Sequence, residues 1–128
     1  MTEEALQFLD SDNGFLLLIN DVHIDWYSHQ REAKNILLSL RNVSDAVEAA
    51  INYQKNSPNT LILFIGAYDC GGFSITEGVQ YGAKGRMEQS YRKHTGNFAT
   101  TFTMGQHHEQ FGKVLTTAEI GDLLKKVA

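Results

Sequence analysis

A carboxylate and an imidazole near the start of the chain have the residue types and spacing of metal ligands. Asp25 and His29 stand four residues apart, and an apolar run, Phe15–Ile19, precedes them. A run of that length is typical of a buried strand, and ligands in open α/β sheets gather beyond the carboxyl ends of the strands. The pattern therefore predicts that these two side chains bind a metal ion together.

Each of these residues also has an ordinary structural interpretation. Asp25 is suited to capping a following helix, because a carboxylate accepts hydrogen bonds from the first free N–H groups, and His29 is suited to an exposed helix start. His23 is expected to be a surface histidine, and Cys70 a small buried hydrophobic residue. The sequence also contains a group of basic residues, which we interpret as a solvated face rather than a phosphate site: Lys84, Arg86, Arg92, Lys93 and His94.

Composition restricts the class of protein. The chain has 128 residues, 42% of them hydrophobic, which predicts a single domain over residues 1–128. No apolar run approaches the roughly 18 residues of a membrane span, and no signal segment opens the chain, so the sequence as written is expected in the cytoplasm and off the membrane. The net charge of −4 comes without a basic face, so nucleic acid is not an expected partner. A single cysteine excludes an internal disulfide.

The order of the predicted elements indicates an α/β fold. After a short helix over 2–9 and the strand over 15–19, apolar residues at three-and-four spacing predict a long helix over 30–55. A second buried strand follows over 60–65. Strand, long helix and strand make a βαβ unit, whose strands are expected to pair in parallel with a right-handed crossover.

The second half of the chain has weaker patterns. A short return strand is predicted over 73–76, an irregular excursion with some helix over 77–94, and a third main strand over 97–104. Thr116 and Glu119 have the spacing of a capping box, and the apolar residues after them predict a final helix.

With these elements in order, the chain resembles the C-terminal part of bacterial alkaline phosphatases, the zinc- and magnesium-dependent phosphomonoesterases. The resemblance runs from end to end and is carried by MTEEAL at the start, Ile24-Asp25-Trp26 with His29, the segment Ala46–Leu63, Gly71-Gly72, Gly105-Gln106-His107, and Thr117-Ala118-Glu119-Ile120. It implies an alkaline-phosphatase-type fold, a truncated, three-layer-like sheet with a parallel βαβ core.

The resemblance also implies a metal site. In the family, the Asp and His of the first block and the His of a Gly-Gly-His-Thr block bind one zinc, and the matching residues here are Asp25, His29 and His107. Two imidazoles and a carboxylate with an open fourth position suit zinc. Taken without the resemblance, His107 is better explained as part of a solvated turn with His108 and Glu109.

Several positions depart from the family pattern. Asn20 replaces a magnesium-binding glutamate, which leaves a magnesium site doubtful. Ala67 and Tyr68 stand where the family has consecutive Asp and His on a second zinc, and Asp69 and Cys70 could take their place only through a two-residue slip. The family's N-terminal portion, with its serine nucleophile and phosphate-clamping arginine, has no counterpart. No catalytic residue is therefore assigned.

Three hypotheses follow from these matches and departures. The first is an alkaline-phosphatase-derived domain that is not a competent phosphomonoesterase and binds one zinc. The second is a hydrolase with residual activity on phosphate esters at that single zinc. The third is an interaction module, because a truncated sheet exposes an apolar edge that a second copy or another chain would cover. The resemblance adds that family members are typically periplasmic or secreted.

Overall fold

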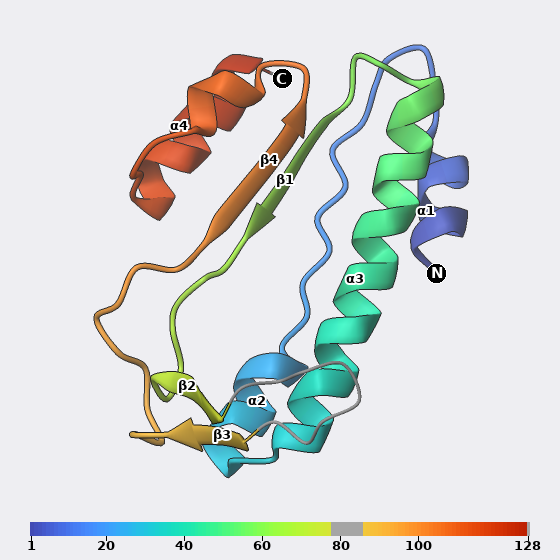
Figure 1. The fold of residues 1–128 in the computed structure, drawn as a ribbon. Helices are drawn as coiled ribbons and strands as arrows, with labels where there is room; N and C mark the ends of the chain where they lie inside the picture. Colours follow the sequence, from blue (N-terminus) through green and yellow to red (C-terminus); the bar gives the residue numbers. More distant parts are fainter. Residues whose placement is uncertain (78–85, 128) are drawn as a thin grey trace. The chain divides into compact units, whose positions relative to one another are not determined.

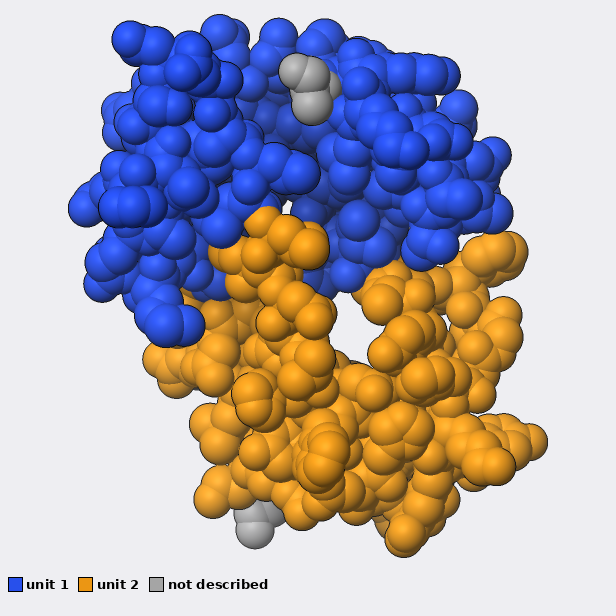
Figure 2. All heavy atoms as spheres, turned by 180° about the vertical axis from the view of Figure 1, so that it is seen from behind, with its two compact units in different colours: residues 1–17, 46–65, 100–128 blue, residues 18–45, 66–99 orange. Residues whose placement is uncertain are grey.

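The computed structural model describes residues 1–77 and 86–127. Two compact units divide the chain: unit 1 comprises residues 1–17, 46–65 and 100–128, and unit 2 comprises residues 18–45 and 66–99 (Figure 2). The mixture of helices and short strands is the α/β class expected from the sequence. The elements in chain order are α1 (Thr2–Leu9), α2 (His23–Gln30), α3 (Ala33–Asn56), β1 (Leu61–Ile65), β2 (Phe73–Glu77), β3 (Arg86–Gln89), β4 (Thr101–Gly105), the 3₁₀ turn η1 (His108–Phe111) and α4 (Thr117–Val127) (Figure 1).

Unit 1 is built on a two-stranded antiparallel ladder. β1 pairs with β4 over five positions, from Leu61 opposite Gly105 to Ile65 opposite Thr101. The core side chains of this unit are less than a tenth exposed and come from α1, α3, η1 and α4: Leu6, Ala49, Phe111 and Ile120. Of these four, Ile120 belongs to the apolar stripe that the sequence predicts for the final helix.

The final helix begins at the predicted capping box. The Thr116 hydroxyl accepts a hydrogen bond from the Glu119 amide at 3.2 Å, and the Glu119 carboxylate accepts one from the Thr116 amide at 2.8 Å. The hydrogen bonds that the Glu119 carboxylate accepts from the Thr116 amide and hydroxyl lower the pKa of this carboxyl, because they favour its charged form. The reciprocal arrangement satisfies two free backbone donors at the helix start.

Unit 2 contains two helical segments where the sequence predicted a turn followed by one helix. α2 ends at Gln30, its C-cap Arg31 has a left-handed backbone with φ of 61°, and α3 begins two residues after Arg31, at Ala33. β2 and β3 form an antiparallel ladder, with Phe73 opposite Gln89. Among the described residues of this unit, Ile36 and Cys70 are the buried hydrophobic side chains.

The predicted parallel pairing is not seen among the described residues, where both ladders are antiparallel. Residues 15–19 carry no strand and are drawn without an arrow in Figure 1, and the side chains of Leu16 and Leu18 are 78% and 86% exposed. A strand requires a partner for its N–H and C=O groups. The expected partner of residues 15–19 was β1, and within the described part of the chain β1 pairs with β4 instead.

The structure also differs from the prediction of an irregular excursion with some helix over 77–94. Residues 78–85 lie outside the described residues, and Arg86–Gln89 form a strand rather than a helix. Exposed and half-buried side chains alternate along this strand, which is the period of a sheet and not of a helix. Among the described helices, none is long and apolar enough to span a membrane.

Replacing Gly105 with alanine is expected to destabilise unit 1 by about 2–4 kcal/mol. Gly105 has φ of +92°, and a Cβ there would stand 2.0 Å from the Thr60 carbonyl oxygen, which is backbone and cannot move aside. Gly121→Ala is the matched control, because a Cβ there meets nothing within 4 Å and alanine favours the helix. Urea denaturation should give opposite shifts for the two variants, and equal shifts would refute the steric argument.

Candidate metal centre

Asp25 and His29 share one face of α2. Residues four apart in a helix lie one above the other, and the His29 Nε2 atom is 3.4 Å from the Asp25 Oδ1 atom. Both side chains are about one-third exposed. The spacing noted in the sequence thus does place a carboxylate and an imidazole together, although the two residues stand within a helix rather than at the end of a strand.

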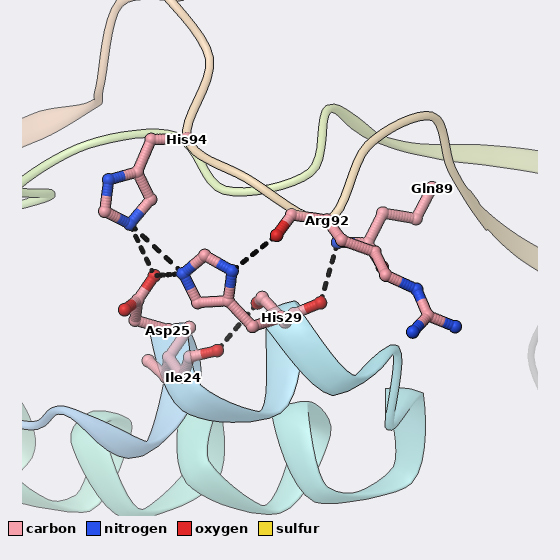
Figure 3. Close-up of polar contacts among 7 residues, drawn as sticks. Ile24, Asp25, His29, Gln89, Arg92 and His94 are labelled. Atoms are coloured by element: carbon pink, nitrogen blue, oxygen red, sulfur yellow. Dashed lines mark hydrogen bonds and ion pairs between the residues drawn. The ribbon is translucent and has the colours of Figure 1, made fainter.

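His94 joins this pair from a segment 65 residues further along the chain (Figure 3). Its Nε2 atom lies 3.1 Å from Asp25 Oδ1 and 3.3 Å from His29 Nε2. The two imidazoles and the carboxylate therefore direct one donor atom each toward a single point.

Backbone hydrogen bonds hold the segment that carries His94. Cys70 and His94 form an isolated antiparallel bridge, and the bonds on either side of it run from the Gly71 amide to the Lys93 carbonyl and from the Thr95 amide to the Asp69 carbonyl. Directly opposed residues in an antiparallel pair present their side chains on the same face. Cys70 and His94 consequently reach the cluster together.

The protonation of His29 is set by a contact on the far side of its ring. His29 Nδ1 lies 2.6 Å from the Arg92 carbonyl oxygen, which can only accept, so Nδ1 carries the proton and donates it. In that tautomer of the neutral ring, the lone pair of Nε2 faces Asp25 and His94. This is the arrangement in which protein histidines bind metals.

A second connection fixes α2 against the strand that precedes His94. The Gln89 side-chain amide donates a hydrogen bond to the Ser28 carbonyl oxygen at 2.7 Å. Ser28 is itself buried, and its hydroxyl donates to the Ile24 carbonyl one turn earlier. Neighbours of both helix ligands are therefore held in place by hydrogen bonds.

Cys70 completes a group of four possible ligands. The donor atoms of Asp25, His29, Cys70 and His94 all lie within 4.8 Å of one another. The Cys70 thiol is buried, and burial raises its pKa to about 11, with further contributions from a hydrogen bond and the charge of Asp25 and from the charge of Asp69. The prediction that Cys70 is a small buried residue is confirmed. It did not include the position of Cys70 beside Asp25, His29 and His94.

Tyr68 stands at one of the family's second-zinc positions, and Asp69 is a residue that a two-residue slip would bring to the other, but both side chains have other contacts here. The Tyr68 ring stacks on His94, with ring centroids 3.8 Å apart. Asp69, two residues before Gly71, accepts hydrogen bonds from the hydroxyl of Thr95 and, at 3.2 Å, from the side-chain amide of Asn97. Asp69 therefore braces the loop that carries His94.

His107, the third ligand implied by the resemblance, belongs to unit 1, at the start of η1. Its participation in the site stays a prediction. His94, which the structure brings to this group, was assigned from the sequence to a solvated basic face. A signal was available, because His94-Thr95 keeps the His-Thr pair of the Gly-Gly-His-Thr block, whereas His107 is followed by His108.

Comparison with known proteins agrees with this architecture. The family model for alkaline phosphatase matches residues 1–90. Alkaline phosphatase 3 and alkaline phosphatase 4 of Bacillus subtilis (strain 168) are 30% and 29% identical to this chain over 76 residues, or 59% of it. The chain spans 16% of the length of these curated relatives.

Solved structures extend the match to nearly the whole chain. The alkaline phosphatase from the Antarctic bacterium TAB5 is 25% identical, with a TM-score of 0.88, over 98% of this chain and 39% of that one. A mutant of the TAB5 enzyme with Mg bound in its M3 site gives the same identity and coverage with a TM-score of 0.87. The resemblance seen in the sequence is confirmed, and the chain belongs to the alkaline phosphatase family.

Proposed function

We propose that this chain is a metal-binding domain of alkaline phosphatase type in which Asp25, His29 and His94 hold one zinc ion. The observation that carries the proposal is the convergence of three donor atoms separated by 3.1, 3.3 and 3.4 Å. Ligand atoms around a tetrahedral zinc stand about 3.3–3.5 Å apart, given bonds of about 2.0–2.2 Å to nitrogen and oxygen. The donor atoms already have nearly the spacing of zinc ligands.

The chemistry of the donors favours zinc over magnesium. Imidazole nitrogen suits zinc, whereas magnesium prefers an octahedral shell of oxygen atoms and keeps several waters. Asn20, which replaces the family's magnesium-binding glutamate, offers only a neutral amide and has an exposed side chain. The magnesium in the M3 site belongs to the TAB5 mutant and gives no ligand set for this chain.

The chain's own residues prepare the site for a cation. Arg92 holds the proton of His29 on Nδ1, so Nε2 is free to coordinate. His94 presents Nε2 to the same point, and the Asp25 carboxylate contributes negative charge. A zinc ion with an open position would, when bound, polarise a phosphoryl oxygen or acidify a water molecule.

We propose further that these residues do not by themselves complete phosphomonoester hydrolysis. Phosphoryl transfer requires stabilised charge at both the attacking and the leaving oxygen, a task that two-metal sites perform with a pair of ions. Ala67 cannot coordinate a second ion, Tyr68 packs on His94, and Asp69 is occupied by Thr95 and Asn97.

An assay with zinc and a generic aryl phosphate tests this. The expected result is no turnover above that of the His29→Ala variant, because a single ion cannot stabilise the charge on both the attacking and the leaving oxygen. Zinc-dependent turnover that disappears in His29→Ala, but persists in the control His23→Ala, would instead favour residual hydrolase activity at one zinc. His23 is an exposed histidine of the same helix that contacts Asp21.

Association is a second candidate function, supported by exposed apolar side chains. Leu16, Leu18 and Phe102 are 78%, 86% and 64% exposed, and within the described residues β1 and β4 form a sheet of only two strands. Extended backbone without a partner favours pairing with another chain.

Light scattering coupled to size exclusion tests association directly. We expect a mass above the 14.3 kDa of the single chain, with Leu16→Lys and Leu18→Glu shifting the mass toward that value. A monomer at high concentration would contradict association with a second copy and leave only a different partner chain.

A further inference from the structure

We infer that Cys70 is a fourth protein ligand, so that the metal centre is closed rather than open to substrate. The inference rests on the proposed zinc site at Asp25, His29 and His94 and changes its chemistry. Structural zinc sites have four protein ligands, whereas catalytic ones keep one position for water or substrate.

The backbone brings the sulfur to the site. Cys70 is the residue opposed to His94 in the antiparallel bridge, so the two side chains leave the backbone on the same face. Backbone bonds from Gly71 to Lys93 and from Thr95 to Asp69 flank this pair and hold its register. Any ion that reaches His94 therefore meets Cys70 as well.

The distances allow coordination. The sulfur lies within 4.8 Å of the donor atoms of Asp25, His29 and His94. A tetrahedral zinc with a sulfur bond of about 2.3 Å and nitrogen bonds of about 2.05 Å separates sulfur from nitrogen by about 3.6 Å. The sulfur therefore lies at most about 1 Å further from the other donor atoms than it would around a bound zinc. A side-chain rotation supplies a movement of that size.

The four ligands also balance the charge of the ion. On binding, the Cys70 S–H bond breaks, its proton leaves to solvent, and a zinc–sulfur bond forms. One thiolate, one carboxylate and two neutral imidazoles sum to −2, which cancels Zn²⁺. A thiolate selects zinc against magnesium, and the Cys70 side chain is buried beside the other three donors.

Cobalt(II) substitution tests this without any activity measurement. A thiolate bound to cobalt gives a strong near-ultraviolet charge-transfer band, and a tetrahedral shell gives intense visible bands. Cys70 is the only cysteine in the sequence, so a charge-transfer band has no other source. We expect the band in the unaltered chain, its loss in Cys70→Ser, and zinc affinity at least about 100-fold lower in that variant.

The outcomes separate this inference from the proposed function. Cobalt that binds through His29 and His94 without a charge-transfer band would overturn the role of Cys70 and leave the zinc site standing. Cobalt and zinc that do not bind at all would overturn both. The band of the unaltered chain decides the matter even if Cys70→Ser fails to fold, and circular dichroism establishes whether that variant folds.

Discussion

Replacing His94 with alanine is expected to weaken zinc binding by at least about 100-fold. Apparent zinc affinities of structural sites correspond to about 10–16 kcal/mol shared among four ligands, so each ligand accounts for about 3 kcal/mol, or a factor of about 100. His94 contacts both of the other proposed ligands, Asp25 and His29, through its Nε2 atom. Its loss removes the one ligand that joins the loop to the helix.

Calorimetry on metal-stripped protein measures this effect and compares the two candidates for the third position. His94→Ala and His107→Ala are titrated beside the unaltered chain, with His108→Ala as control, since the His108 ring nitrogen already bonds the Gly105 carbonyl oxygen at 2.8 Å. A loss confined to His107→Ala would assign the third position to the residue implied by the family resemblance. Unchanged binding in His94→Ala would reject the ligand set proposed here.

Zinc is expected to raise the free energy of unfolding of unit 2 by about 4 kcal/mol when its concentration is about 1,000 times the dissociation constant. The ion binds only where Asp25, His29 and His94 are brought together, so it stabilises the folded state over the unfolded one. Magnesium at the same concentration should produce little shift, because its preferred ligands are oxygen atoms.

Tryptophan fluorescence in urea provides the measurement. Trp26 is the only tryptophan of the sequence and stands next to Asp25 on α2, with its side chain 64% exposed. We expect the zinc-induced shift of the urea midpoint to vanish in His29→Ala and to persist in His23→Ala. A shift of the same size in both variants would mean that zinc binds elsewhere.

Local features of the sequence predicted local structure well. The capping box of Thr116 and Glu119 and the helix after it follow from a three-residue spacing and apolar periodicity. Asp25 and His29 were selected as residues that follow a predicted strand, and the structure instead brings them together by their four-residue spacing on a helix. In short-range patterns of this kind, the period of the helix alone fixes which residues lie on the same face.

Features that depend on distant partners were the ones missed. His94 reaches the site only through its bridge to Cys70, and no periodicity in the glycine-rich segment between them indicates that pairing. Phe15–Ile19 has the composition of a buried strand, yet it finds no strand partner within the described part of the chain. An apolar composition favours burial of a segment, but a segment becomes part of a sheet only where another strand lies beside it.

The family resemblance supplied the chemistry that patterns could not. It implied that Asp25 and His29 are zinc ligands, and it drew attention to Ala67 and Tyr68 as departures. It implied that the third histidine is His107, because Gly105 precedes that residue as glycine precedes the histidine of the family's Gly-Gly-His-Thr block. His94 is followed by Thr95, and so keeps the His-Thr pair of that block. A histidine selected by its following residue would have led to His94.

X-ray absorption at the zinc edge of the loaded chain is the most direct test of the metal centre. The account predicts two imidazole nitrogens and one carboxylate oxygen at about 2.0–2.2 Å, with one sulfur at about 2.3 Å from Cys70. A shell of two imidazoles without sulfur would keep the zinc site and remove Cys70 from it. A shell of oxygen atoms with no imidazole would contradict the central claim that this chain forms a zinc centre from Asp25, His29 and His94.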